Sequence, residues 1–114
     1  MTDDEKYSVM LLDGDGGMEN FNGDSQVDVY VDVIEALAEH YNLKENISLA
    51  YGPGSKRAII NTTPENLDGS EMHSFHELSN ELYVNTNLNR GEKIRYITQL
   101  ASACGLNIHS SGWD

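Results

Sequence analysis

The amino-acid sequence predicts a single α+β domain with two main helices on one face of an antiparallel sheet. Two segments, residues 31–42 and 89–104, place apolar side chains at helical spacing. The other apolar segments are too short for helices, and two of them, residues 47–51 and 57–62, flank a Gly-Pro-Gly loop as the arms of a hairpin do. Because strands outnumber helices and one pair forms a hairpin, we expect a ferredoxin-like sandwich.

The first third of the chain is predicted to contain a strand, an irregular acidic loop and the start of a helix. Residues 7–12, YSVMLL, are apolar and end at an Asp-Gly pair, which is typical of a buried strand. The Gly-rich segment that follows is expected to be a loop as far as Ser25. Residues 27–33 fit both a strand, because Val alternates with Asp and Tyr, and the first turns of a helix that stops at Asn42.

The rest of the chain alternates short elements with one well-marked helix. Residues 72–78 are expected to form a short helix and residues 82–86 a strand. The last helix begins at Asn89, which forms a capping-box pattern with Glu92. Residues 107–110 are expected to add a final strand.

The whole chain, residues 1–114, is expected to be one acidic domain, because this length buries a single core of ordinary size. Residues 1–6 and 111–114 are expected to fray at the two ends. For the C-terminal end we also expect Trp113 to fold back over the sheet; the alternative is that it protrudes as an aromatic anchor for another chain.

Composition excludes several classes of function. A net charge of −12 repels nucleic-acid phosphates and anionic lipid, so direct nucleic-acid or membrane binding is not expected. One cysteine excludes an intrachain disulfide, and no signal-peptide pattern or bilayer-length apolar run is present. We therefore expect a cytoplasmic protein, in its own cell or in an infected host.

The acidic residues concentrate in the N-terminal third, which contains 11 carboxylates and one basic residue, Lys6, within residues 1–39. If residues 28–39 are helical, four carboxylates spaced by four, three and four residues form a ridge about 16 Å long, namely Asp28, Asp32, Glu35 and Glu39. Such a row can imitate nucleic-acid phosphates and occupy a basic groove. The candidate partner-binding residues are Asp24, Asp28, Asp32, Glu35 and Glu39.

The preferred function is therefore that of a non-enzymatic protein that binds a basic protein partner, such as a nucleic-acid-binding protein that it inhibits by DNA mimicry. In size and charge the chain resembles small acidic inhibitors encoded by viruses and mobile elements. We expect reversal of the four ridge carboxylates to Lys to weaken partner binding by orders of magnitude while the fold stays intact. Acidity as salt adaptation of a solvated surface is the other reading of the charge.

The main alternative is a divalent-cation site in the loop 13–24. Asp and Asn side chains that alternate with Gly offer oxygen ligands to Ca²⁺ or Mg²⁺. The segment NFNGDSQVD resembles an EF-hand or dockerin-type loop, although Ser25 stands at the sixth position and Val31 at the twelfth. The candidate ligands are Asp13, Asp15, Asn20, Asn22 and Asp24.

A catalytic form of that site is suggested by the segment VMLLDGDGG, which resembles the first motif of haloacid-dehalogenase-type phosphohydrolases. That resemblance implies that Asp13 is the nucleophile, that Asp15 is the acid/base and that Mg²⁺ bridges the site. Thr62 would stand for the second motif of the family and Lys93 for the third. Gly17 occupies the position where the family has Thr.

Overall fold

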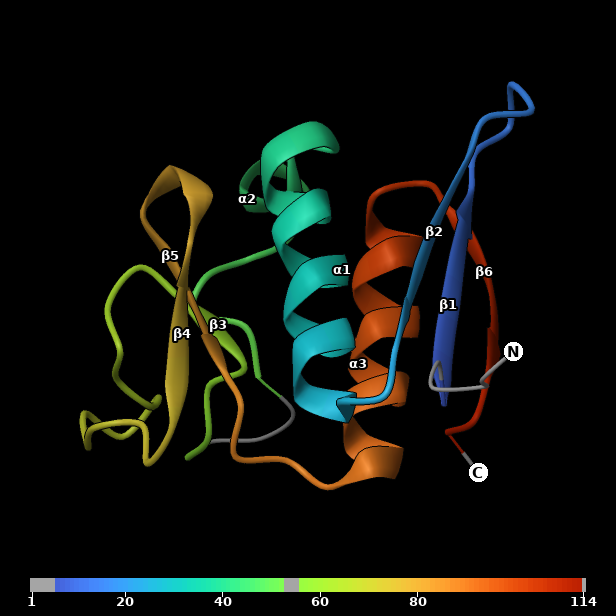
Figure 1. Ribbon diagram of the computed structural model, residues 1–114. Helices are drawn as coiled ribbons and strands as arrows, with labels where there is room; N and C mark the ends of the chain where they lie inside the picture. Colours follow the sequence, from blue (N-terminus) through green and yellow to red (C-terminus); the bar gives the residue numbers. More distant parts are fainter. Residues whose placement is uncertain (1–5, 53–55, 114) are drawn as a thin grey trace.

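The computed structural model describes residues 6–52 and 56–113, and these form three layers: a sheet, a pair of helices and a second sheet (Figure 1). The first sheet contains β1 (Tyr7–Leu12), β2 (Met18–Gly23) and β6 (Asn107–Ser111). The second contains β3 (Ile60–Asn61), β4 (Phe75–Leu78) and β5 (Leu82–Asn85). The helices are α1 (Gln26–His40), α2 (Leu43–Asn46), α3 (Arg90–Ala103) and the 3₁₀ turn η1 (Ser79–Glu81).

Both sheets are antiparallel, with strand orders β2-β1-β6 and β3-β5-β4. The α+β class is therefore confirmed. The expectation of one sheet with both helices on one face is wrong, and a ferredoxin-like arrangement is not confirmed. The helices instead lie between two three-stranded sheets (Figure 1).

The physical reason for two sheets lies in α1, which is apolar around most of its circumference. Its buried residues are Val29, Tyr30, Val33, Ile34, Ala36, Leu37 and Ala38. A helix with one narrow apolar stripe needs cover on one side only, whereas this helix needs cover on two. Accordingly α1 contacts β1 and β2 of the first sheet and β4 and β5 of the second.

Local signals set the ends of both long helices as expected. Ser25 Oγ accepts a hydrogen bond from Asp28 N–H (3.3 Å) and caps α1. Residues 27–33, which fitted both a strand and a helix, are therefore helical. Asn42 follows α1 in the left-handed conformation at φ 56°, which confirms the predicted stop. The capping box of α3 is also confirmed, because Asn89 and Glu92 exchange hydrogen bonds between side chain and backbone (2.8 and 3.0 Å).

Three expectations about local structure are wrong. The segment to Ser25 contains strand β2. Its Asn and Gly residues are poor strand formers, so the strand has no local signal in the sequence and forms because it pairs with β1. Residues 75–78 form strand β4 rather than the end of a helix, because pairing with β5 overrides the helical spacing of three apolar residues. The hairpin 47–51/57–62 is reduced to one bridge, Tyr51 to Ile60, and its loop at 53–55 lies outside the described residues.

The C-terminal end packs onto β1 instead of fraying. Ser111 ends β6, and the Trp113 ring lies 5.1 Å from the Tyr7 ring while its indole N–H donates to the Ser8 carbonyl (3.1 Å). Burial of this large ring explains why residues 111–113 are held in place. Residues 1–5 and 114, for which fraying was also expected, lie outside the described residues.

None of the helices in the described part of the chain has the length and apolar character needed to cross a lipid bilayer.

Candidate functional site

Helix α1 presents its exposed side between two edge strands, β2 of the first sheet and β4 of the second. We call this side, with Asp28 and Asp32 exposed on it, the acidic face. The only ion pair among residues 6–52 and 56–113 joins Arg57 to Glu92 (2.6 Å) and is elsewhere, so neither aspartate has a basic partner there. The two carboxylates are therefore open to a partner.

The four predicted ridge carboxylates do not form one free row. Glu35 is half-buried, and its carboxylate accepts hydrogen bonds from Ser79 N–H (3.0 Å) and from the Ser79 hydroxyl. Glu39 is exposed at the far end of α1, beside a separate hollow of about 630 Å³ that Lys44 also lines. The helix is confirmed, but the expectation that all four can be reversed with an intact fold is revised at Glu35, because this carboxylate holds α1 to η1.

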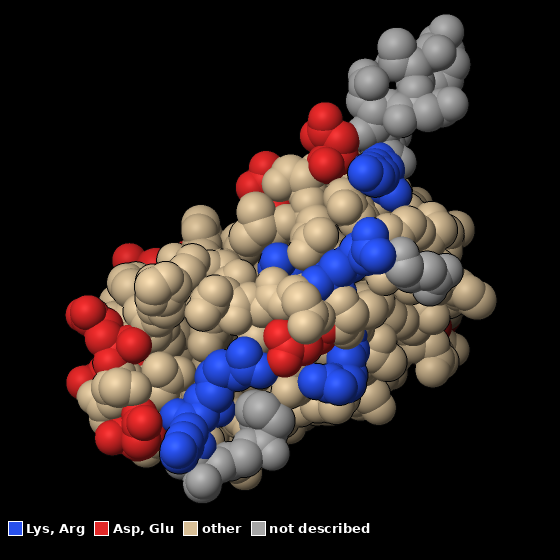
Figure 2. Space-filling model, turned by 90° about the horizontal axis from the view of Figure 1, so that it is seen from below, with Lys and Arg blue, Asp and Glu red and all other residues tan. Residues whose placement is uncertain are grey.

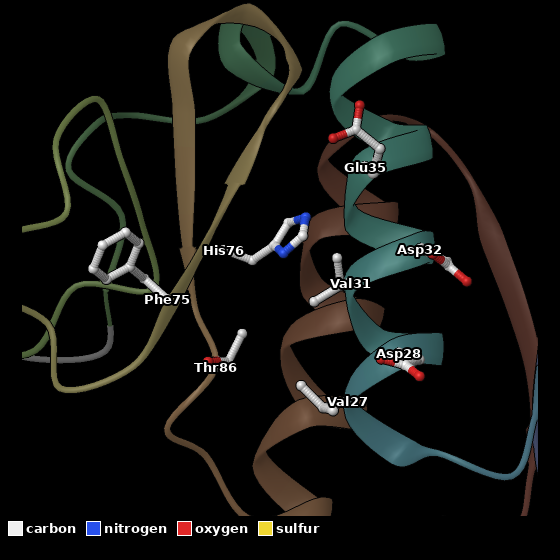
Figure 3. Close-up of a pocket in the computed structure, with 8 residues that line it drawn as sticks. All are labelled: Val27, Asp28, Val31, Asp32, Glu35, Phe75, His76 and Thr86. Atoms are coloured by element: carbon white, nitrogen blue, oxygen red, sulfur yellow. The ribbon is translucent and has the colours of Figure 1, made fainter.

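A groove of about 520 Å³ runs between α1 and β4. Figure 3 shows Val27, Val31 and Glu35 pointing from α1 toward β4, and His76 pointing back toward α1. Asp28 and Asp32 form its outer rim and point away from β4 in the same view. None of the residues that line the α1–β4 groove is Lys or Arg, so apolar side chains and carboxylates dominate it.

At one end of the groove hydrogen bonds join the β4–β5 turn to α1, and at the other end the floor is apolar. Near Glu35, the Asn80 side chain donates to the Ala38 carbonyl (2.7 Å), which fastens the β4–β5 turn to α1. At the opposite end Val27 is 37% exposed and forms part of the apolar floor. The spacing between α1 and the second sheet is fixed by the buried Tyr30, whose hydroxyl donates to the Asn85 carbonyl (3.0 Å). Burial raises the pKa of Tyr30, so this hydroxyl stays a donor.

Sequence reasoning missed the residues on the β4 side of the groove and the apolar floor. Residues 72–78 were expected to be helical, so His76 was not placed opposite α1. The floor was detectable in principle, because Val27, Val31 and Glu35 are four residues apart and share a helix face outside the core stripe. This spacing indicates a shared face only if residues 27–33 are helical, and the sequence left that segment open between strand and helix.

The residues of the predicted cation loop are spread along a hairpin. Asp13 closes the β1–β2 turn, where its carboxylate accepts from the N–H groups of Asp15 (2.8 Å) and Gly17 (2.9 Å). Asn20 and Asn22 are exposed along β2, and Asp24 lies beyond its far end, about 20 Å from the turn at the rise of an extended strand. In residues 6–52 and 56–113 no three His, Cys, Asp or Glu side chains are grouped to hold a metal ion. The five candidates therefore do not surround one point.

The residues of the phosphohydrolase resemblance also lie apart. Asp13 follows β1, which is the central strand of an antiparallel sheet and leads into a hairpin. Thr62 follows β3, in the sheet on the other side of the helices (Figure 1). Lys93 is only 7% exposed, and its ammonium donates to Gln26 Oε1 and the Leu88 carbonyl (2.8 Å each), while burial lowers its pKa. The structure does not bring these three side chains together.

Basic residues gather on another side of the molecule, around the N-terminal end of α3. Figure 2, which views the molecule from below, shows Lys and Arg side chains along this side. Lys6 and Arg90 both influence Tyr7, whose pKa is lowered mainly by its hydrogen bond with Gln26. We call Lys6, Arg57 and Arg90, which lie around Tyr7 and the first turn of α3, the basic face. Within the part of the chain that the structure describes, none of these three cations forms an ion pair with Asp28 or Asp32.

Comparison of the chain with models of known protein families, with curated proteins and with solved structures found no match.

Proposed function

We propose that this chain is a non-enzymatic binding protein whose acidic face engages a basic protein partner. The observation that carries the proposal is the pair Asp28 and Asp32, exposed one helical turn apart and without a basic partner in the described residues. Like charges at this spacing weaken a helix by a few tenths of a kcal/mol. A basic partner would offset that cost.

The net charge of the chain supports the same proposal. A net charge of −12, with 11 carboxylates and one basic residue within residues 1–39, gives the molecule a field that attracts and steers a basic partner before contact. A partner that normally holds a phosphate backbone would have its groove occluded by the acidic face. In that form the protein acts as a nucleic-acid mimic.

The test is a selection of random peptides, displayed on phage, on the immobilised protein. Wild type is expected to enrich sequences that contain Lys and Arg, and the enriched phage should fail to bind the Asp28→Lys/Asp32→Lys variant. The Glu65→Lys/Glu71→Lys variant changes the net charge equally at exposed positions elsewhere and should retain binding. Since Asp28 also lies in the first turn of α1, thermal unfolding of each variant checks the fold, and Asp32→Lys alone provides a second reading.

Enrichment of peptides without basic residues would contradict the proposal. Equal binding of the enriched phage to wild type and to a folded Asp28→Lys/Asp32→Lys variant would do the same. Equal losses of phage binding in the two double variants would show that binding depends on overall net charge and not on the acidic face, which would also contradict the proposal.

A further inference from the structure

Strand β4 is an edge strand with one row of backbone groups directed away from its sheet. Thr86 N–H donates to the Ser74 carbonyl (2.9 Å), and this pair continues the register that matches His76 with Val84. In an antiparallel pair, hydrogen-bonded and non-hydrogen-bonded positions alternate. The N–H and C=O groups of Phe75 and Glu77 therefore face the free edge.

The alternation on the other side of β5 agrees with this assignment. Asn85 N–H donates to the Ile59 carbonyl (2.8 Å), so Asn85 points toward β3 while its neighbours Val84 and Thr86 point toward β4. An open row of donors and acceptors is a template for a further strand. This template borders the α1–β4 groove.

The side chains around that edge specify what such a strand would carry. Side chains of an added strand alternate between the face of the sheet toward α1 and the outer face. Those directed toward α1 would meet Val27 and Val31 first and would reach the carboxylates of Asp28 and Asp32 at the outer rim of the groove. Long basic side chains fit this arrangement, because their stems pack on apolar surface while their charged ends reach carboxylates.

The outer face favours apolar residues. Phe75 is 43% exposed and its ring contacts the Tyr83 ring edge to face, at 5.7 Å. An apolar side chain of an added strand would cover this exposed ring. The pattern that fits β4 is therefore an alternation of basic and apolar residues.

Building on the proposed function, we infer that the partner contributes an extended segment of alternating basic and apolar residues, which pairs with the free edge of β4 and places its basic side chains in the α1–β4 groove. Main-chain hydrogen bonds supply affinity, and the carboxylates supply selectivity. The partner is thus a protein with an exposed basic strand or a basic tail that becomes extended on binding.

The experiment uses a ten-residue peptide in which Lys and Val alternate, with binding measured by fluorescence anisotropy. Glu77→Pro removes an N–H donor that faces the free edge. It breaks no hydrogen bond between β4 and β5, and edge strands tolerate proline at such positions. Relative to its matched control Glu77→Ala, we expect Glu77→Pro to weaken binding by about tenfold, the loss of roughly one main-chain hydrogen bond. Asn20→Pro makes the same change at the free edge of β2 and should bind as wild type does.

A second reading does not depend on how the proline variant folds. The same peptide with methyl groups on the backbone nitrogens of its Val residues keeps its charge and loses the N–H donors that would face β4, and wild type should bind it about tenfold more weakly. Equal binding of both peptides, together with equal binding by Glu77→Pro and Glu77→Ala, overturns strand pairing. Absence of any binding to the wild-type protein overturns it too.

The two proposals can fail separately. If Asp28→Lys/Asp32→Lys loses the peptide while Glu77→Pro keeps it, the acidic face binds basic segments without strand pairing. If Asp28→Lys/Asp32→Lys binds the peptide as tightly as wild type, the proposed function fails.

Discussion

Helices α1 and α3 lie side by side between the same two sheets, yet they use their carboxylates in opposite ways. On α3, Glu92 closes a capping box with Asn89 and pairs with Arg57. On α1, Asp28 and Asp32 are exposed without an ion pair in the described part of the chain. A carboxylate with an internal partner is explained by the fold, whereas an exposed pair without one is where a binding function is best sought.

Glu35 sharpens this comparison, because it lies on α1 but, like Glu92, its carboxylate has hydrogen-bond partners inside the molecule. Replacing Glu35 with Gln weakens the hydrogen bonds from Ser79 and should lower the free energy of unfolding by about 1–2 kcal/mol. Its matched variant Asp32→Asn should change that free energy by less than about 0.5 kcal/mol. Urea unfolding of both variants measures the difference, and equal losses would remove the distinction between used and unused carboxylates.

The pH dependence of stability should depend on Glu92. The hydrogen bond from Asn89 N–H, and then Arg57, hold the pKa of Glu92 below its ordinary value of 4.5. Because the folded pKa is the lower one, this stabilisation is complete above the ordinary pKa and is lost as the pH falls through the folded pKa. Glu92→Gln keeps the capping hydrogen bond and loses only the charge. It should therefore lower the free energy of unfolding by less than about 1 kcal/mol at pH 7.

The measurement is urea unfolding of wild type and Glu92→Gln in steps from pH 7 to about pH 3. The gap between the two proteins should close at the acid end. Glu71→Gln, which removes an exposed carboxylate, serves as the control for lost charge. A constant gap at every pH would show that the Glu92 charge does not stabilise α3.

Divalent cations should have the smallest effect. The candidate ligands on the β1–β2 hairpin do not converge, so millimolar Ca²⁺ or Mg²⁺ should shift thermal unfolding no more than NaCl of equal ionic strength does. A site filled at a hundredfold excess over Kd would instead add about 2.7 kcal/mol. A shift specific to one divalent ion and lost in Asp15→Asn would move the function to the 13–17 turn.

What the sequence predicted depends on how local the signals are. Ser25 and Asn89 cap their helices through side chains a few residues away, so both helices and the stop at Asn42 follow from short patterns. Strand β2 is made by pairing with β1, and its Asn and Gly residues carry no strand signal of their own.

The site combines both kinds of signal. Asp28 and Asp32 follow from the charge of residues 1–39 together with the helical spacing of its carboxylates. The groove was not, because it requires β4 to be a strand and Val27 to be helical, and residues 72–78 and 27–33 each fit more than one local structure. The role of Glu35 depends on Ser79, which is 44 residues away in the sequence, so only the fold places the two together.

The most direct test of the central claim is an NMR titration of the ¹⁵N-labelled protein with the Lys-Val peptide. The proposed function predicts amide shift changes in the first turns of α1, at Val27–Asp32, and the inferred strand pairing adds changes at Phe75 and Glu77 in β4. The 13–17 turn and the basic face around Arg90 should not respond. Changes confined to either of those regions, or no saturable change at all, would contradict the claim that the acidic face is the binding surface.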